Sequence, residues 1–155
     1  MSSVVVLFDL HSGIFPKAIT GVSDDDAHIR LNTKANHMAW LTGSLVQERF
    51  ELAREFGIDK KQSADELFSN HKGIQDGTRY PALSLLQKDW EIITPLLREA
   101  LANVTDERLD KPFEMPGMQM SFYDLIIFMT YREANCIGQL ALWRRLLNYD
   151  PIKYD

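Results

Sequence analysis

Five side chains able to do chemistry fall on two otherwise apolar helical faces. On one predicted helix, His37, Ser44 and Glu48 recur at spacings that place them on the same side. On another, Arg132 and Cys136 are four residues apart, so both lie on one face. A buried arginine requires an anionic partner, because removing its charge from water costs several kcal/mol. Glu48, which can accept two guanidinium hydrogen bonds, is the expected partner.

The expected Arg132–Glu48 pair has three interpretations. The pair joins two helices as a structural contact, in which case replacing Arg132 by alanine costs about 3 kcal/mol or more. Alternatively, Arg132 lines a pocket and binds the carboxylate or phosphate of a small ligand, or it extends into solvent. Cys136 beside this charge could act as a nucleophile, but no base or oxyanion donor is evident. A small apolar core cysteine is the simpler interpretation.

Four segments have the periodicity of amphipathic helices. They are residues 4–20, 32–56, 81–101 and 121–147. Residues 58–80 are polar and poorly patterned, apart from one turn of helix near 64–68. Four long helices with little strand signal predict an all-α fold, specifically a four-helix bundle in which a long crossover connection joins helices 2 and 3.

The first and fourth predicted helices have expected inner faces. In the first, the inner stripe is Leu7, Leu10, Ile14 and Ala18, with His11 among them. In the fourth, it is Leu125, Phe128, Met129, Cys136, Leu140, Trp143 and Leu147, with Arg132 at its centre. The opposite side of the fourth helix is also apolar or small, at Ile127, Ala134, Gly138, Ala141 and Leu142. One small bundle buries a single face of such a helix, so we expect a homodimer through this second face, with internal burial as the alternative.

Composition limits the class of protein. The chain has 155 residues and a formal net charge of −5, with 45% hydrophobic residues, which is typical of one globular domain spanning 1–155. Its Lys and Arg residues are scattered, which disfavours a nucleic-acid partner. A single cysteine excludes an internal disulfide and a multi-cysteine zinc site. Because neither a signal peptide nor an apolar run of about 20 residues is evident, we expect a cytoplasmic protein without membrane contact.

Two stretches of the sequence resemble a known family. NHMAWLTGSL (36–45) and REANCIGQL (132–140) are similar to motifs of the DinB-like (DinB/YfiT) four-helix bundles, and the resemblance extends over nearly the whole chain. Members of that family hold a divalent metal with one histidine from the second helix and two from the fourth. Their usual patterns are Trp-x-x-Gly-His and His-Glu-Ala-x-His-x-Gly-Gln. Trp40, Gly138 and Gln139 match those patterns.

The metal-ligand positions depart from the family pattern. The three positions fall on Ser44, Arg132 and Cys136, and none is histidine. Serine is a poor ligand for zinc or nickel, and arginine keeps its proton and its charge. We therefore expect the inherited site to hold no metal. The alternative is a rebuilt zinc or nickel site on His37, Glu48 and Cys136.

The resemblance and the residues together give three functional hypotheses. The first is a binding or regulatory module without metal, whose inter-helix cleft binds a small anionic ligand or none. The residues expected to line that cleft are Trp40, Ser44, Glu48, Arg132, Cys136 and Gln139. The second is a thiol-dependent transferase or isomerase of the kind the resemblance implies, which requires a metal. The third is a stress-related structural protein that acts through its dimer face. His28 and His71, like His11, are assigned no role.

Overall fold

The computed structural model describes residues 1–115 and 117–154, and this part of the chain is mostly helical. Its α-helices are α1 (Ser2–Ile19), α2 (Met38–Glu55), α3 (Asp65–Phe68), α4 (Leu83–Ala102), α5 (Asp106–Leu109) and α6 (Phe122–Leu146). The short elements are the 3₁₀ turns η1 (Asp26–His28) and η2 (Ser69–His71) and the strands β1 (Pro112–Met115) and β2 (Met118–Ser121). The expected helical class is confirmed, and α1, α2, α4 and α6 each have 18 residues or more.

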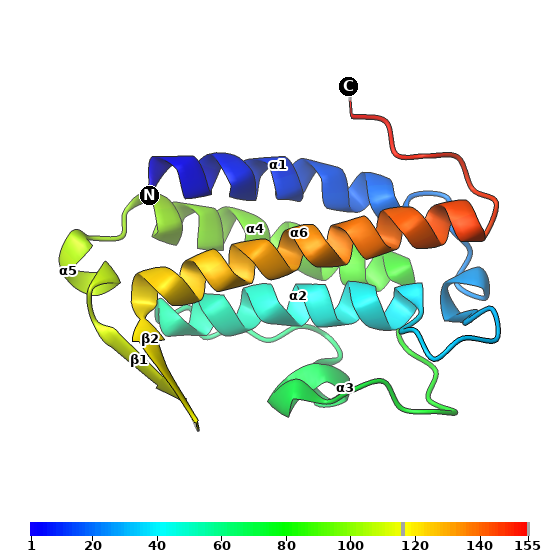
Figure 1. Cartoon of the computed structure of the whole chain (residues 1–155), viewed down its shortest axis with the longest axis horizontal. Helices are drawn as coiled ribbons and strands as arrows, with labels where there is room; N and C mark the ends of the chain where they lie inside the picture. The colour runs from blue at the N-terminus through cyan, green and yellow to red at the C-terminus, as the bar shows by residue number, and fades with distance from the viewer. Residues whose placement is uncertain (116, 155) are drawn as a thin grey trace.

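The long helices pack side by side along a common direction (Figure 1). α1 contacts α4 and α6, and α2 contacts the same two helices from the other side. α2 and α4 both run from right to left in Figure 1, so the chain between them returns along the length of the molecule and carries α3. Parallel neighbours require such a long connection, whereas antiparallel helices need only a short loop.

The helix ends follow from local capping. At the start of α6, Ser121 and Asp124 form a reciprocal capping box. α2 begins at Met38 rather than near residue 32, and the Nδ1 atom of His37 accepts a hydrogen bond from the Trp40 backbone N–H at 3.2 Å. The predicted earlier start is wrong because Leu31 and Asn32 have φ angles of 49° and 57°, which a right-handed helix cannot include.

The inner face of α1 differs from the predicted stripe. Leu7 and Leu10 are 45% and 53% exposed, whereas the buried side of α1 carries Val4, Phe8, His11, Phe15 and Ala18. α1 is apolar on most sides, so periodicity alone does not select a face. The bulky rings decide it: Phe15 packs against Trp90, with ring centroids 4.1 Å apart.

α1 also meets a simple test for a membrane-spanning helix. By length and composition it is long and apolar enough to cross a membrane, with a mean hydropathy of 1.2 over 18 residues. This differs from the expectation that no segment would qualify. The core helix of a soluble protein and a signal sequence near the N-terminus pass the same test.

The hairpin of β1 and β2 was not predicted. The strands pair antiparallel, with Phe113 opposite Met120 and Glu114 opposite Gln119. Strands of four residues are too short to show a clear alternation of apolar and polar residues in the sequence. Gly117, at φ 81°, supplies the left-handed turn conformation. The hairpin lies against the start of α6 and brings additional apolar side chains to that end of the molecule.

The buried face of α6 centres on Glu133 rather than on Arg132. Glu133 is 6% exposed, whereas the Arg132 side chain is 37% exposed, and Phe128, which was expected to face inward, is 46% exposed. The prediction of a centrally buried Arg132 is therefore wrong by one position, or about 100° around the helix. A carboxylate, and not a guanidinium, occupies the middle of the inner stripe.

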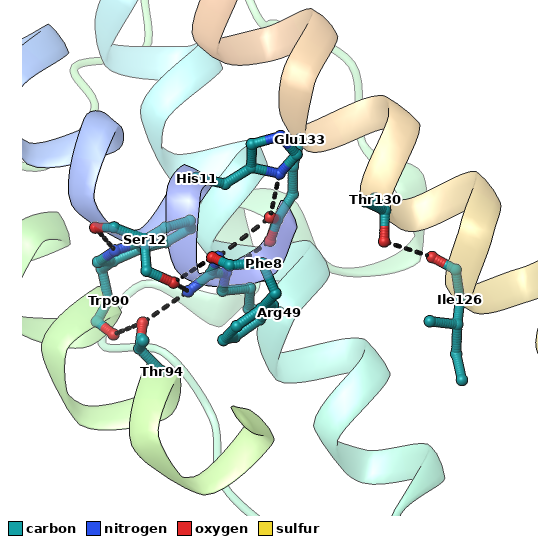
Figure 2. A network of polar contacts seen from close by, with 9 residues as sticks. All are labelled: Phe8, His11, Ser12, Arg49, Trp90, Thr94, Ile126, Thr130 and Glu133. Carbon is teal, nitrogen blue, oxygen red and sulfur yellow. Dashed lines mark hydrogen bonds and ion pairs between the residues drawn. The ribbon is translucent and has the colours of Figure 1, made fainter. Parts of the chain in front are cut away.

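A second arginine, Arg49 of α2, binds the Glu133 carboxylate (Figure 2). Its Nε and Nη2 atoms donate to the two oxygens of Glu133 at 2.5 and 3.0 Å. Its Nη1 atom donates to the Ser12 hydroxyl at 3.0 Å and to the Thr94 hydroxyl at 2.7 Å. His11, assigned no role from the sequence, contacts Glu133 through Nδ1 at 3.1 Å. One guanidinium thus joins α1, α2, α4 and α6.

Aromatic rings enclose this network. The guanidinium carbon of Arg49 lies 3.9 Å from the centre of the Phe8 ring and 3.4 Å from that of Trp90, a cation–π arrangement. Burial alone raises the pKa of the Glu133 carboxyl, but the charge of Arg49 and the hydrogen bonds from His11 and Arg49 outweigh it, so this pKa is lowered overall. Glu133 therefore remains ionised in the core because each of its oxygens has a partner.

Replacing the two arginines separately tests which ion pair holds the fold. Arg49→Met leaves the Glu133 charge in the core without its main partner, and we expect it to lower the free energy of unfolding by about 3–5 kcal/mol. The matched variant Arg132→Met should lower it by less than about 1 kcal/mol, because the Arg132 side chain is 37% exposed and its charge remains partly hydrated without Glu48. Urea denaturation at pH 6 measures both values. Equal losses would contradict this assignment.

Candidate functional site

A cavity of about 630 Å³ opens between α2, the hairpin and α6. Its apolar wall comes from the hairpin and from α6, and its charged wall comes mainly from α2. The apolar lining residues are Leu52, Phe113, Met118, Met120, Leu125, Phe128 and Met129, and the polar ones are Glu48, Glu51, Arg54, Glu55, His71 and Arg132. We call this cavity the α2–α6 groove. An apolar cavity with a few convergent polar groups is the usual form of a small-molecule site.

A smaller hollow of about 80 Å³ adjoins the groove. Its lining comprises Trp40, Ser44, Gln47, Glu48, Glu51, Phe68, His71, Lys72 and Arg132. Glu48, Glu51, His71 and Arg132 line both spaces. These shared residues therefore mark the junction between the apolar groove and the polar hollow.

The predicted ion pair between Glu48 and Arg132 is confirmed and lies at this junction. The Nη2 atom of Arg132 is 2.6 Å from Oε1 of Glu48, and the Glu48 side chain is only 8% exposed. Burial raises the pKa of the Glu48 carboxyl to about 7, since Arg132 lowers it by less than burial raises it and the charges of Glu133 and Glu51 raise it further. Glu48 is therefore a carboxyl that gains and loses a proton near neutral pH.

Two buried polar atoms at the hollow lack partners. Oε2 of Glu48 and Nε1 of Trp40 make no hydrogen bond within the described part of the chain. Such atoms are rare because each unmade hydrogen bond costs free energy. The arrangement leaves one acceptor and one donor available at a cavity that is itself larger than the roughly 30 Å³ a water molecule occupies in the liquid.

The residues expected to line the cleft divide into two groups. Trp40, Ser44, Glu48 and Arg132 line the small hollow. Cys136 and Gln139 line neither space. Gln139 lies on the exposed side of α6, where it donates to Asn135 at 2.7 Å.

Cys136 packs into the core and is 7% exposed. Burial, together with the negative charge of Glu48, raises the pKa of its thiol to about 11. A thiol with that pKa stays protonated at neutral pH and is a weak nucleophile. Its position thus agrees with a core cysteine.

The residues at the family's metal-ligand positions do not fit a metal. Ser44, Arg132 and Cys136 supply a hydroxyl, a permanent cation engaged by Glu48, and a thiol held in its protonated form. A dication needs neutral nitrogen ligands or anionic ones, and it is repelled by a guanidinium. No reaction step through a metal follows from this donor set.

His37, Glu48 and Cys136, the candidates for a rebuilt metal site, do not come together at one point either. His37 precedes Glu48 by eleven residues along α2, a rise of about 16 Å. His37 instead caps α2 and packs against His28 and Tyr80, with ring centroids 5.0 and 5.4 Å away. Burial lowers the pKa of His37 to about 4, as does the nearby His28. Over residues 1–115 and 117–154, no three His, Cys, Asp or Glu side chains are placed to hold one ion.

His71 is a groove residue that the sequence did not reveal. It lines both spaces, although it lies in the poorly patterned connection after α2. Asn70 and His71 have consecutive positive φ angles of 58° and 55°. A left-handed histidine is uncommon, and such strain concentrates at functional sites. The Asn-His pair carries no sequence signal strong enough to predict this conformation.

Comparison with models of protein families finds no match for the chain, and comparison with curated proteins finds none either.

The ionisation of Glu48 is testable through stability. An unfolded glutamate titrates near 4.5, so the folded chain binds the extra proton between pH 4.5 and about 7 and loses stability as pH rises through that window. Above pH 7 the loss reaches up to about 3 kcal/mol, which Glu48→Gln avoids. The free energy of unfolding of the variant minus that of wild type should therefore increase by that amount from pH 4.5 to 8 in urea denaturation.

A constant difference for Glu48→Gln would show that its carboxyl titrates like an exposed one.

Proposed function

We propose that this chain is a metal-free four-helix bundle of the DinB-like type that binds a small amphipathic anion in the α2–α6 groove. The observation that carries the proposal is the half-open Arg132–Glu48 pair at the end of an apolar cavity. The bundle assignment rests on the four long, mutually packed helices and on the resemblance of residues 36–45 and 132–140.

The groove suits a ligand with two chemically different parts. Phe113, Met118 and Met120 of the hairpin face α6 residues across the cavity and offer an adaptable apolar surface. Methionine side chains are flexible and polarisable, so such a wall accepts varied shapes. At the junction, Arg132 uses Nη2 for Glu48, and its side chain remains 37% exposed. The other guanidinium nitrogens are the natural donors to a carboxylate, sulfonate or phosphate.

The proposal does not include metal chemistry. The alternative inferred from the resemblance, a thiol-dependent transferase or isomerase, needs zinc or nickel. Neither Ser44, Arg132 and Cys136 nor His37, Glu48 and Cys136 form a ligand set for such an ion. The proposed protein acts by binding, in the cytoplasm, without a nucleic-acid or membrane partner.

Binding of matched probes tests the proposal. 1-Octanesulfonate and 1-octanol share an alkyl chain and differ in charge. At pH 6 we expect wild type to bind the sulfonate at least tenfold more tightly, because its anionic head contacts Arg132. Arg132→Gln should remove this preference and leave octanol binding within about twofold. Isothermal titration calorimetry measures both affinities.

Two outcomes would contradict the proposal. Failure of both probes to bind would show that the groove is not a ligand site. One equivalent of zinc or nickel, found by mass spectrometry in protein purified without chelators, would contradict its metal-free character.

We also propose that two copies associate through the outer faces of α6 and α1. On α6, Ile127, Tyr131 and Leu142 are 39%, 64% and 58% exposed, and on the adjacent α1, Val6, Leu7 and Leu10 are 67%, 45% and 53% exposed. Large apolar side chains exposed on adjacent helices are typical of a protein–protein interaction surface. The small residues Ala134 and Gly138, which lie between Tyr131 and Leu142 along α6, are also exposed and would let a partner helix approach closely.

Dilution tests the interface. We expect wild type to sediment as a dimer at tens of micromolar, and Leu142→Glu to sediment as a monomer because the charge would be buried without a partner. Ile92→Glu, at a 51% exposed apolar position on α4, is the matched control and should remain dimeric. A monomeric wild type at that concentration would refute the dimer.

A further inference from the structure

Glu48 already binds Arg132, which is the cation that a ligand anion would contact. Its Oε1 atom lies 2.6 Å from Nη2 of Arg132, and both residues line the groove and the hollow. An anion that reaches Arg132 therefore comes close to a carboxylate already held on the same guanidinium. Two negative groups beside one guanidinium repel each other, and the burial of the Glu48 side chain, which is 8% exposed, strengthens that repulsion.

Arg54 and Lys72 also line these spaces, but among the described residues neither forms an ion pair with Glu48. From α6, Glu133 is engaged by Arg49 and His11, and Cys136 is a protonated thiol. From α2, Glu51 faces Arg54 at 3.8 Å.

The connection after α3 contributes two further groups. Lys72 donates to the backbone oxygen of Glu66 at 2.6 Å, and His71 lines both spaces. Arg132 is therefore the cation in contact with Glu48 among the described residues.

The second oxygen of Glu48 offers another solution. Oε2 is buried and makes no hydrogen bond within the described residues, so it can accept a proton without breaking an existing contact. A protonated carboxyl ceases to compete for Arg132 and becomes a donor to the incoming anion. Burial already holds the pKa of this carboxyl at about 7, so neutral solution supplies that proton readily.

We propose that the groove binds its anion together with one proton, which Glu48 takes from solvent at Oε2. This inference rests on the proposed function of the groove. One O–H bond forms on Glu48, and no other covalent bond changes. The net charge of the group formed by Arg132, Glu48 and the ligand is the same in both states: Arg132 balances the Glu48 carboxylate without ligand, and it balances the ligand anion once Glu48 is protonated. Affinity should therefore fall as pH rises above about 7.

Calorimetry in pairs of buffers with different ionisation enthalpies counts the protons. With 1-octanesulfonate, which does not titrate between pH 5 and 9, we expect uptake approaching one proton per ligand at pH 8.5 and close to none at pH 5.5. The dissociation constant should rise by up to tenfold per pH unit above 7. 1-Octanol, which brings no charge, should bind with no proton uptake and no pH dependence.

Glu48→Gln keeps the size of the side chain and cannot titrate. It should bind 1-octanesulfonate at pH 8.5 as tightly as wild type does at pH 5.5, with no proton uptake. His71→Asn removes the imidazole that lines both spaces, and loss of the proton uptake in this variant would assign the proton to His71 instead. Thermal unfolding establishes that both variants are folded.

The outcomes separate this inference from the proposed function. Sulfonate binding without proton uptake, or uptake that survives Glu48→Gln or disappears in His71→Asn, would overturn the role of Glu48 and leave the groove as a binding site. No sulfonate binding at any pH would overturn the proposed function itself. The absence of proton uptake by wild type with 1-octanesulfonate would overturn the inference even if a variant fails to fold.

Discussion

The buried contact between Arg49 and Glu133 is the constraint on which the rest of the structure depends. A charged carboxylate in the core persists only where its oxygens are paired, and this one is held by two guanidinium nitrogens and by His11. The remaining nitrogen of Arg49 reaches α1 and α4. Because one side chain needs partners on three other helices, the rotation of each helix about its axis is fixed together.

That rotation places the candidate site. Arg132 precedes Glu133 by one residue, so its side chain projects about 100° away around α6. With Glu133 turned to the core, Arg132 is turned toward α2 and the groove, where it contacts Glu48. The partly exposed Arg132–Glu48 pair thus follows from the buried Arg49–Glu133 pair, since adjacent positions on a helix cannot both face the centre of the bundle.

The two arginine–glutamate pairs differ in how completely they are satisfied. Every oxygen of Glu133 has a partner and aromatic rings cover Arg49, so the pair contributes to the specificity of the core and offers nothing to a ligand. Glu48 keeps a free oxygen, and Arg132 remains partly in solvent. Unmade hydrogen bonds beside an apolar cavity are costly to the fold and favour a ligand that completes them. The same residue types thus serve stability in one place and recognition in the other.

Local sequence determined the helical class and the capping box at Ser121, because periodicity and capping act over a few residues. The contact between Glu48 and Arg132 was predicted from their complementary charges on two inward faces, and the packed helices realise it. Tertiary structure decided which arginine is buried, which face of α1 is inside, and that His71 and the hairpin reach the groove. A stripe of apolar residues predicts that one face of a helix is buried, but it does not predict which helix packs against that face. Arg49 and Glu133 are 84 positions apart, and only the assembled helices bring them together.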